Sequence, residues 1–398
     1  MLRNPVQEYS WGSRTAIQDL LGEPCPHKGP VAELWMGAHP KACSSVMVRG
    51  EWGPLDKIIE KNPESVLGKA AARRFSDKLP FLFKVLAVDS PLSLQVHPNL
   101  EQAHKGFDRE RGLGIPSDAP ERNYRDENHK PEILCALTPF EVMTGFRTIN
   151  EILGLMEKVS CPSLSNELAR FMKSPDIFGL KSFLADLMGM EEVRRRLAVG
   201  EAARLAKQFA GRDPAFGWMV KLNQAYPGDA GVFSPLFLNL MTLAPGEAIY
   251  VRAGEVHAYL HGFGIELMAN SDNVVRAGLT AKHVDIPEFL KIAGLRNEPG
   301  RAIRPVISGP CKRIYETPAQ EFQLSVITVD KDDSFISPSK RSAEILLCLR
   351  GNAVIKDLGR RGSVAIGRGG SVIVPSAVPG YRIKGDAIFY KASVPVLG

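Results

Sequence analysis

Hydrophobic and polar positions alternate in two different ways along the chain. In residues 149–226, apolar side chains recur at the spacing of one helical face, which predicts amphipathic helices. Elsewhere the apolar runs have strand length, as at Phe81–Val88, and are separated by glycine and proline. We therefore predict a mainly β protein with an α-helical insertion. The clearest helical stripes are Leu168, Phe171 and Met172, then Leu180, Phe183, Leu184, Leu187 and Met188.

These patterns divide the chain into four predicted segments, because 398 residues exceed the size of one ordinary core. Short strands and turns after residue 300 predict a jelly-roll or cupin-like barrel, with Arg350-Gly351-Asn352 as one of the turns. Residues 99–127 are polar and predict a long loop with no more than a helical turn. The segments are 1–148 (first part of a cupin-like barrel), 149–230 (helical domain), 231–300 (second part of that barrel) and 301–398 (C-terminal barrel).

Four side chains in three separate segments indicate a metal site. Gln95 and His97 lie two residues apart in a run of β-type residues, so we expect them to face the same side of a strand. Glu132, at the end of Asn-His-Lys-Pro-Glu, offers a carboxylate, and His257 offers a second imidazole. Together they form a set of ligands that zinc accepts, although glutamine is an unusual member.

The strand period also predicts which neighbours of these ligands enter the site. If the segment before Glu132 is extended, Lys130 shares its face and His129 faces the opposite side. Pro131 interrupts this alternation, so the assignment stays an expectation. Tyr259 likewise shares a face with His257.

Three motifs resemble the type I (zinc-dependent) mannose-6-phosphate isomerases. The strongest runs from Tyr124 to Glu132 and is similar to the family signature Tyr-x-Asp-x-Asn-His-Lys-Pro-Glu. Gln95-Val96-His97-Pro98 and the stretch from His257 to Thr280 are the other two, and the similarity covers nearly the whole chain. Arg252 departs from the family, which often has proline there, and this affects a turn and no ligand.

The resemblance implies one zinc ion per chain and two cupin-like barrels with a helical insertion. It implies interconversion of mannose 6-phosphate and fructose 6-phosphate: a base removes the C2 proton of the open-chain aldose, and the proton of the resulting cis-enediolate returns to C1. The zinc ligands would be Gln95, His97, Glu132 and His257, and the catalytic arginine would be Arg276. Candidate proton carriers are Glu266, Asp272, Lys130 and His129; candidate substrate contacts are Trp11, Ser93, Lys130 and Tyr259, with the phosphate held by Ser93 and Lys130 as one option.

Other interpretations stay open at this point. An iron-dependent cupin oxygenase uses two histidines and one carboxylate with open positions, and Gln95 would occupy a position that dioxygen needs. A non-catalytic sugar-binding cupin would not require Lys130, Glu266 and Arg276, and all three are present. Arg276 could also form a structural ion pair with Asp272.

Composition limits the classes of binding partner and the compartment that we expect for this protein. The net charge is +6, but basic residues are interleaved with acids, which argues against nucleic acid as a partner. No run is long enough to span a bilayer, and we see no segment that resembles a signal peptide. Six scattered cysteines without Cys-x-x-Cys pairs indicate free thiols in a reducing compartment. We expect a cytoplasmic protein with a sugar phosphate substrate, and infer no obligatory protein partner.

Overall fold

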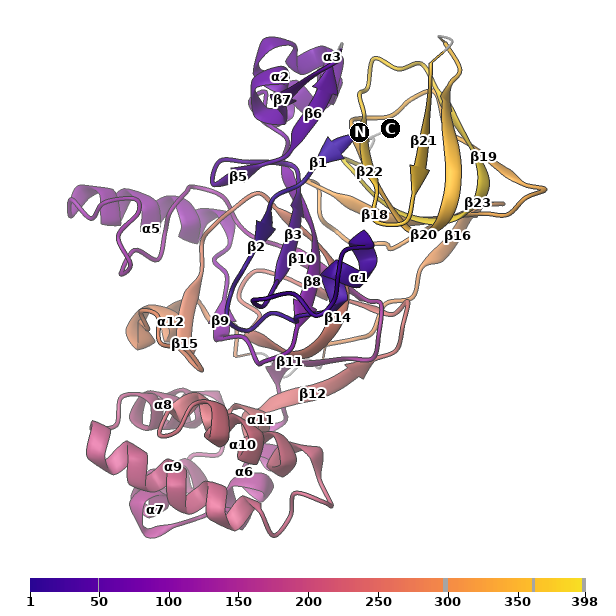
Figure 1. The fold of residues 1–398 in the computed structure, drawn as a ribbon. Helices are drawn as coiled ribbons and strands as arrows, with labels where there is room; N and C mark the ends of the chain where they lie inside the picture. The colour runs from indigo at the N-terminus through magenta and orange to yellow at the C-terminus, as the bar shows by residue number, and fades with distance from the viewer. Residues whose placement is uncertain (49, 296–299, 360–361, 396–398) are drawn as a thin grey trace.

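The computed structural model describes residues 1–48, 50–295, 300–359 and 362–395. Figure 1 shows a central β region, a helical region below it and a β-barrel formed by the C-terminal part of the chain. The mainly β class with an α-helical insertion is therefore confirmed. The domain boundaries stay predictions, and the first, third and fourth predicted segments each contain residues outside the described ranges.

The N-terminal part of the chain supplies one edge of the central sheet and a small three-stranded sheet beside it. Its last long strand is the apolar run predicted as a strand, and all eight of its residues are buried. The elements are β1 (Leu2–Arg3), β2 (Val6–Gln7), α1 (Ala16–Leu21), β3 (Glu33–Met36), β4 (Ala38–His39), β5 (Ala42–Cys43), β6 (Ser45–Val48), β7 (Glu51–Pro54), α2 (Leu55–Lys61), α3 (Pro63–Leu67), α4 (Lys69–Arg74) and β8 (Phe81–Val88).

One long strand, β14 (His257–Ala269), organises the ten-stranded central sheet. It pairs with four other strands, and the main path of the sheet runs β12-β11-β14-β8-β3-β2. Because β14 has partners along its whole length, its two ends bring distant parts of the chain together. The other strands are β9 (Leu94–Val96), β10 (Glu132–Ala136), β11 (Phe140–Phe146), β12 (Leu238–Leu243), β13 (Ala248–Val251) and β15 (Val275–Gly278).

The helical insertion has its own apolar core, which continues under the sheet to Val96, Ala258 and Val275. Its first helix begins at a capping box in which Thr148 and Glu151 satisfy each other's backbone N–H groups. The helices are α6 (Ile149–Lys158), η1 (Pro162–Leu164), α7 (Ser165–Lys173), α8 (Ile177–Met188), α9 (Glu192–Ala206), α10 (Pro214–Ala225), η2 (Ala230–Phe233) and α11 (Ser234–Phe237), and a further helix, α12 (Ile286–Ile292), follows β15.

The predicted helical stripes are confirmed with one exception. The five stripe residues of α8 are buried, as are Leu168 and Phe171 of α7. Met172 is 47% exposed, because it lies at the edge of the stripe, where α7 no longer contacts the insertion's core.

The prediction of a loop over residues 99–127 was wrong in its first half. Leu100–Gly112 forms helix α5, which starts at a capping box between Asn99 and Gln102. The helix buries little apolar surface; its buried residues include Ala103, Gly106 and Glu110. A search for apolar periodicity therefore misses it, whereas Asn-x-x-Gln was a usable start signal.

The C-terminal region forms an eight-stranded sheet with the path β16-β17-β18-β23-β20-β21. Two of its strands are longer than the short strands predicted. The predicted turn at Arg350-Gly351-Asn352 lies inside β20 and is paired with β23, directly after a bulge at which the pairing shifts between Cys348 and Arg350. Gly351 has φ +79°. The strands are β16 (Val306–Gly309), β17 (Lys312–Ile314), β18 (Gln323–Val329), β19 (Ser334–Ile336), β20 (Glu344–Asp357), β21 (Ser363–Gly367), β22 (Ser371–Val374) and β23 (Tyr381–Ser393).

The C-terminal barrel packs directly on the central sheet. One apolar core joins Phe81 and Ile265 of the central sheet to Leu324 and Ile345 of the barrel. The hydroxyl of Tyr315 also donates to the carbonyl of Gly246 at 2.8 Å. The central sheet thus lies between the helical insertion and the barrel, so the strands that carry the candidate ligands are buried.

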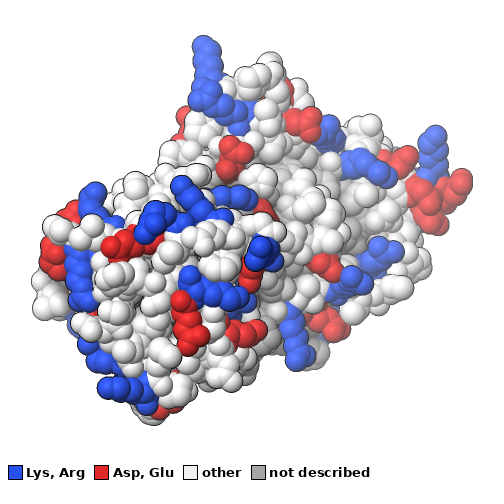
Figure 2. All heavy atoms as spheres, turned by 90° about the horizontal axis from the view of Figure 1, so that it is seen from below, with Lys and Arg blue, Asp and Glu red and all other residues white. Residues whose placement is uncertain are grey.

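One face of the molecule carries charges of both signs. Seen from below, that face carries interspersed basic and acidic side chains (Figure 2). Within the described ranges, every helix is too short or too polar to cross a bilayer.

A pair of glycine substitutions tests the packing that positions Trp11. A Cβ at Gly12 would lie 2.5 Å from the backbone nitrogen of Ala32, so Gly12→Ala should push the Trp11 segment off the sheet and destabilise the protein by about 1–3 kcal/mol. Gly154→Ala is the matched control, because Gly154 lies inside α6 with open space around it and should stabilise by about 0.5–1 kcal/mol. Thermal unfolding of both variants measures the difference; equal midpoints would contradict the close approach at Gly12.

Candidate metal centre and active site

Strand pairing brings the three candidate ligand segments together. Strand β9 lies between β15 and the start of β14, where Gln95 is paired with both His257 and Arg276. His97 directly follows β9, which ends at Val96, so the strand stops one residue before the second predicted ligand. Glu132 opens β10, which pairs with both β13 and β14.

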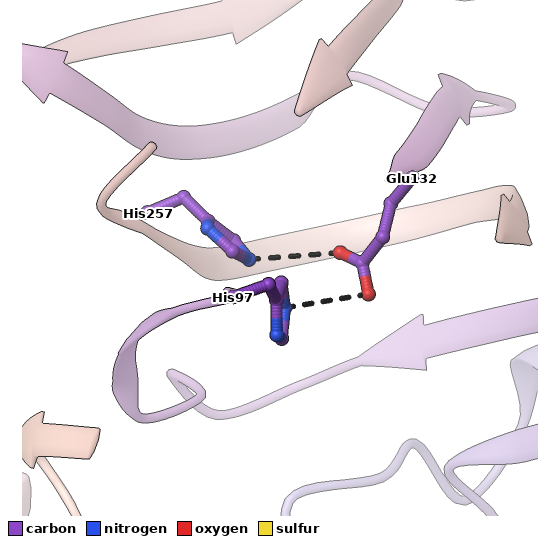
Figure 3. A group of neighbouring side chains, drawn as sticks. All are labelled: His97, Glu132 and His257. Atoms are coloured by element: carbon purple, nitrogen blue, oxygen red, sulfur yellow. Dashed lines mark ion pairs between the residues drawn. The ribbon is translucent and has the colours of Figure 1, made fainter. Parts of the chain in front are cut away.

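The ligand atoms of His97, Glu132 and His257 converge on one buried point (Figure 3). Nε2 of His97 lies 3.5 Å from Oε1 of Glu132, and Nε2 of His257 lies 3.6 Å from Oε2. The amide nitrogen of Gln95 lies 3.2 Å from Nε2 of His257, and rotation of the amide by 180° exchanges it for the oxygen that a metal takes. Two ligands of a tetrahedral zinc ion are separated by about 3.3 Å, so the spacing fits that ion.

The outer nitrogens of both imidazoles are already committed to backbone carbonyls. Nδ1 of His97 donates to the carbonyl of Asn273 at 2.8 Å, and Nδ1 of His257 donates to that of Glu255 at 2.9 Å. Each Nε2 therefore keeps a lone pair directed at the site, as in metal-binding histidines. Nε2 of His97 is buried and has no hydrogen-bond partner among the described residues, so it is an orphaned nitrogen whose lone pair a metal ion would satisfy.

Electrostatics also favour deprotonated ligands. Burial alone would raise the pKa of Glu132, but Lys130, together with His97 and His257, holds it well below its usual range. Burial, assisted by Lys130, lowers the pKa of His97 well below its ordinary value, so its imidazole is neutral. A neutral imidazole beside an ionised carboxylate is the state that zinc binding requires.

The two residues before Pro131 face opposite sides, as the strand period predicted. Nζ of Lys130 lies 3.1 Å from Oε1 of Glu132, so Lys130 enters the site. Nε2 of His129 instead lies 2.8 Å from a carboxylate oxygen of Glu321, just before β18 of the C-terminal barrel. Lys130 therefore lies against the candidate metal ligands, and His129 lies against the C-terminal region.

The predicted substrate contacts Trp11 and Tyr259 belong to one apolar cluster beside the ligands. Tyr259 is buried, and its hydroxyl donates to Oε2 of Glu132 at 3.4 Å. Burial, with Glu132, raises the pKa of Tyr259 well above its ordinary value, so the hydroxyl stays protonated. The contact of Tyr259 seen here is thus with Glu132. Trp11 is only partly buried, and Ser93 precedes β9. Contact of these three residues with a sugar stays a prediction.

Glu266 belongs to a buried ion-pair network that the sequence did not reveal. It faces Lys84 across β14 and β8, at 2.9 Å, and Lys84 also lies 3.5 Å from Glu33, which accepts from the indole of Trp35. Burial raises the pKa of Glu266 and outweighs the attraction of Lys84. The available signal was a lysine inside the otherwise apolar run of β8, since a buried charge requires a partner.

Arg276 lies beside two further cations that the sequence did not single out. Burial, together with the charge of Arg125, lowers the pKa of Arg276. Burial likewise lowers the pKa of Lys282, with Arg276, Lys41 and Arg125 contributing. Across the described residues, these three side chains form no ion pair with a carboxylate, and Asp272 pairs with Lys41 instead of Arg276.

Comparison with known proteins agrees with this geometry. Residues 1–149 match the family model of the phosphomannose isomerase type I catalytic domain. The chain is 43% identical over 363 residues to the mannose-6-phosphate isomerase of Salmonella typhimurium, covering 89% of this chain and 90% of the relative. It is 35% identical over 402 residues to the human enzyme, covering 93% and 91%.

A solved structure extends the similarity to the fold. The Salmonella typhimurium mannose 6-phosphate isomerase bound to its substrate, fructose 6-phosphate, and to zinc superposes with a TM-score of 0.90 at 38% identity, over 99% of both chains. This match confirms the predicted cupin-type arrangement and favours an isomerase over an oxygenase or a non-catalytic sugar-binding protein. With this identity over nearly its whole length, the chain belongs to the type I phosphomannose isomerase family.

Proposed function

We propose that this chain interconverts mannose 6-phosphate and fructose 6-phosphate with one zinc ion held by Gln95, His97, Glu132 and His257. The observation that carries the proposal is the buried convergence of these ligands beside Lys130, in a chain whose relatives are named for this activity. When bound, zinc polarises an oxygen of the sugar and stabilises negative charge that develops on it.

The chain's own residues would move the proton between C2 and C1. We propose that Lys130, which lies against the metal ligand Glu132, donates to the reacting oxygens of the sugar. Glu266 is the favoured proton carrier, because a carboxyl whose pKa is raised by burial can both take and return a proton. Lys84 would hold it in place. Asp272, which is ionised and partly exposed, is better suited to accept a hydrogen bond from a sugar hydroxyl.

The phosphate group requires cations at the other end of the sugar. The charge of Arg125 lowers the pKa of Arg276, and the charges of Arg276 and Arg125 lower that of Lys282. None of the three side chains pairs with a carboxylate in the described ranges, so an anion among them would relieve this repulsion. We propose that Lys282 and Arg125 hold the phosphate, in preference to Ser93 and Lys130. Arg276 would lie between the phosphate and the metal and stabilise the enediolate.

We also propose that the protein acts in the cytoplasm and without an obligatory protein partner. All six cysteines are free thiols, and Cys135, Cys161 and Cys348 are buried. Unpaired cysteines are typical of a reducing compartment.

Metal removal is the first test. A chelator should abolish isomerase activity and added zinc should restore it, because without the ion the buried carboxylate and the unpartnered imidazole cannot organise the sugar. Alanine at any of the four ligands should lower the zinc content measured by elemental analysis. His104→Ala, at an exposed histidine, is the control and should keep its zinc. Full activity of metal-free protein would rule out the site.

Lys130→Ala should keep zinc and lose turnover. Removal of one donor to a developing oxyanion typically costs a factor of about 10² to 10³ in kcat. His129→Ala is the matched neighbour: it should lose its contact with Glu321 and some thermal stability, with kcat little changed. The reverse outcome, a loss of turnover only in His129→Ala, would mean that the orientation we describe is not the catalytic one.

Substitutions of Arg276 and Lys282 should affect different kinetic constants. Arg276→Ala should lower kcat by about 10² to 10³, and Arg276→Lys should recover only part, because an ammonium lacks the planar fork. Lys282→Ala should mainly raise KM, by about 10- to 100-fold for one lost charge-assisted contact. Steady-state kinetics with mannose 6-phosphate distinguishes the two; an unchanged KM in Lys282→Ala would place the phosphate elsewhere.

A further inference from the structure

We propose that the hairpin formed by β4 and β5 positions the active site, through His39 and Lys41, by holding the carboxylate of Asp272 in one orientation. This inference rests on the proposed function, in which Asp272 accepts a hydrogen bond from the sugar. His39 and Lys41 are positioning residues in this account, because they act on the substrate only through Asp272.

The backbone at Asp272 is tied to the metal site. Its N–H donates to the carboxylate of Asp126 at 2.7 Å, and the next residue, Asn273, donates to the carbonyls of Asp126 and Asn128. The carbonyl of Asn273 accepts from Nδ1 of His97. Asp272 therefore has a defined position relative to a zinc ligand, and the remaining freedom is that of its side chain.

His39 presents a neutral N–H to one oxygen of that side chain. Nδ1 of His39 accepts from the backbone N–H of Lys41 at 3.2 Å, so the ring proton lies on Nε2, which is 3.6 Å from Oδ1 of Asp272. Burial lowers the pKa of His39 to about 4, so the ring is uncharged near neutral pH. The indole of Trp35 packs edge-on against the ring at 4.9 Å and keeps it in this orientation.

Lys41 supplies the charge. Its Nζ lies 2.9 Å from Oδ2 of Asp272, so the two oxygens have different partners. Burial on its own would raise the pKa of Asp272, but its neighbours, His39 and Lys41 first among them, lower it. Because His39 is neutral, Lys41 is the nearest cation that keeps the carboxylate ionised. An exposed lysine contributes little to stability, so its removal should change the chemistry more than the fold.

The hairpin itself has a rigid base. β4 and β5 pair only with each other in the described sheets, but buried Ser44 ties both sides of the hairpin. Its N–H donates to the carbonyl of Gly37, and its hydroxyl accepts from the N–H of Gly37. The side chains at the tip are thus presented to Asp272 from a fixed frame.

The test compares Lys41→Met with Lys41→Arg. We expect Lys41→Met to lower kcat about tenfold with unchanged zinc content and thermal midpoint, and Lys41→Arg to restore most of the loss. The acidic limb of the kcat–pH profile should move up in Lys41→Met by about half to one pH unit, because loss of the cation raises the pKa of Asp272. The titratable and charged groups near Asp272 are Tyr9, His39, Lys41, Asp126 and Lys130. Lys57→Met, at an exposed ion pair with Glu60, is the control and should leave kinetics unchanged.

A double-mutant cycle tests whether Lys41 acts through Asp272. In an Asp272→Asn background, Lys41→Met should have no further effect on kcat, because the group through which it acts is gone. His39→Gln, which keeps a neutral donor, should retain more activity than His39→Phe. Equal effects of Lys41→Met with and without Asp272, or an unshifted pH profile, would overturn the inference. Absence of isomerase activity in the zinc-loaded parent protein would instead overturn the proposed function.

Discussion

A buried carboxylate between two buried imidazoles is the constraint on which the site depends. Transfer of a charged group from water into the protein interior costs several kcal/mol of free energy unless opposite charges or hydrogen bonds compensate it. Glu132 has Lys130 on one oxygen and the hydroxyl of Tyr259 near the other. In the part of the chain that the structure describes, Nε2 of His97 beside it has no hydrogen-bond partner. A divalent cation satisfies both the charge and the orphaned nitrogen, so the same feature that costs stability without metal creates affinity for it.

This constraint requires a rigid scaffold, and β14 provides it. His257 opens the strand, Tyr259 follows on the same face, and Glu266 lies further along against Lys84. The strand is covered by the helical insertion's core at its start and by the core shared with the C-terminal barrel further along. Both outer regions thus contribute to function by excluding water from strands whose polar side chains converge inside.

Much of the site's geometry was predictable from the local order of residues along the chain. The two-residue spacing of Gln95 and His97 and the strand period around Lys130 predicted orientations that the geometry agrees with, since side-chain direction along an extended segment is a local property. The helical stripe of α8 followed from the same kind of reasoning, because a packed helix needs one apolar face. Helix α5 was missed because it buries small and polar residues, so its apolar pattern is weak.

The sequence by itself determined the candidate ligands, the class of fold and the reaction expected of a family with these motifs. Only the tertiary structure decided which charges act together. The contacts between Glu266 and Lys84, between Arg276 and its neighbouring cations, and between Asp272 and the β4–β5 hairpin join residues far apart in the chain. Local periodicity says nothing about such pairs, because they are set by strand register and by the packing of whole elements against one another.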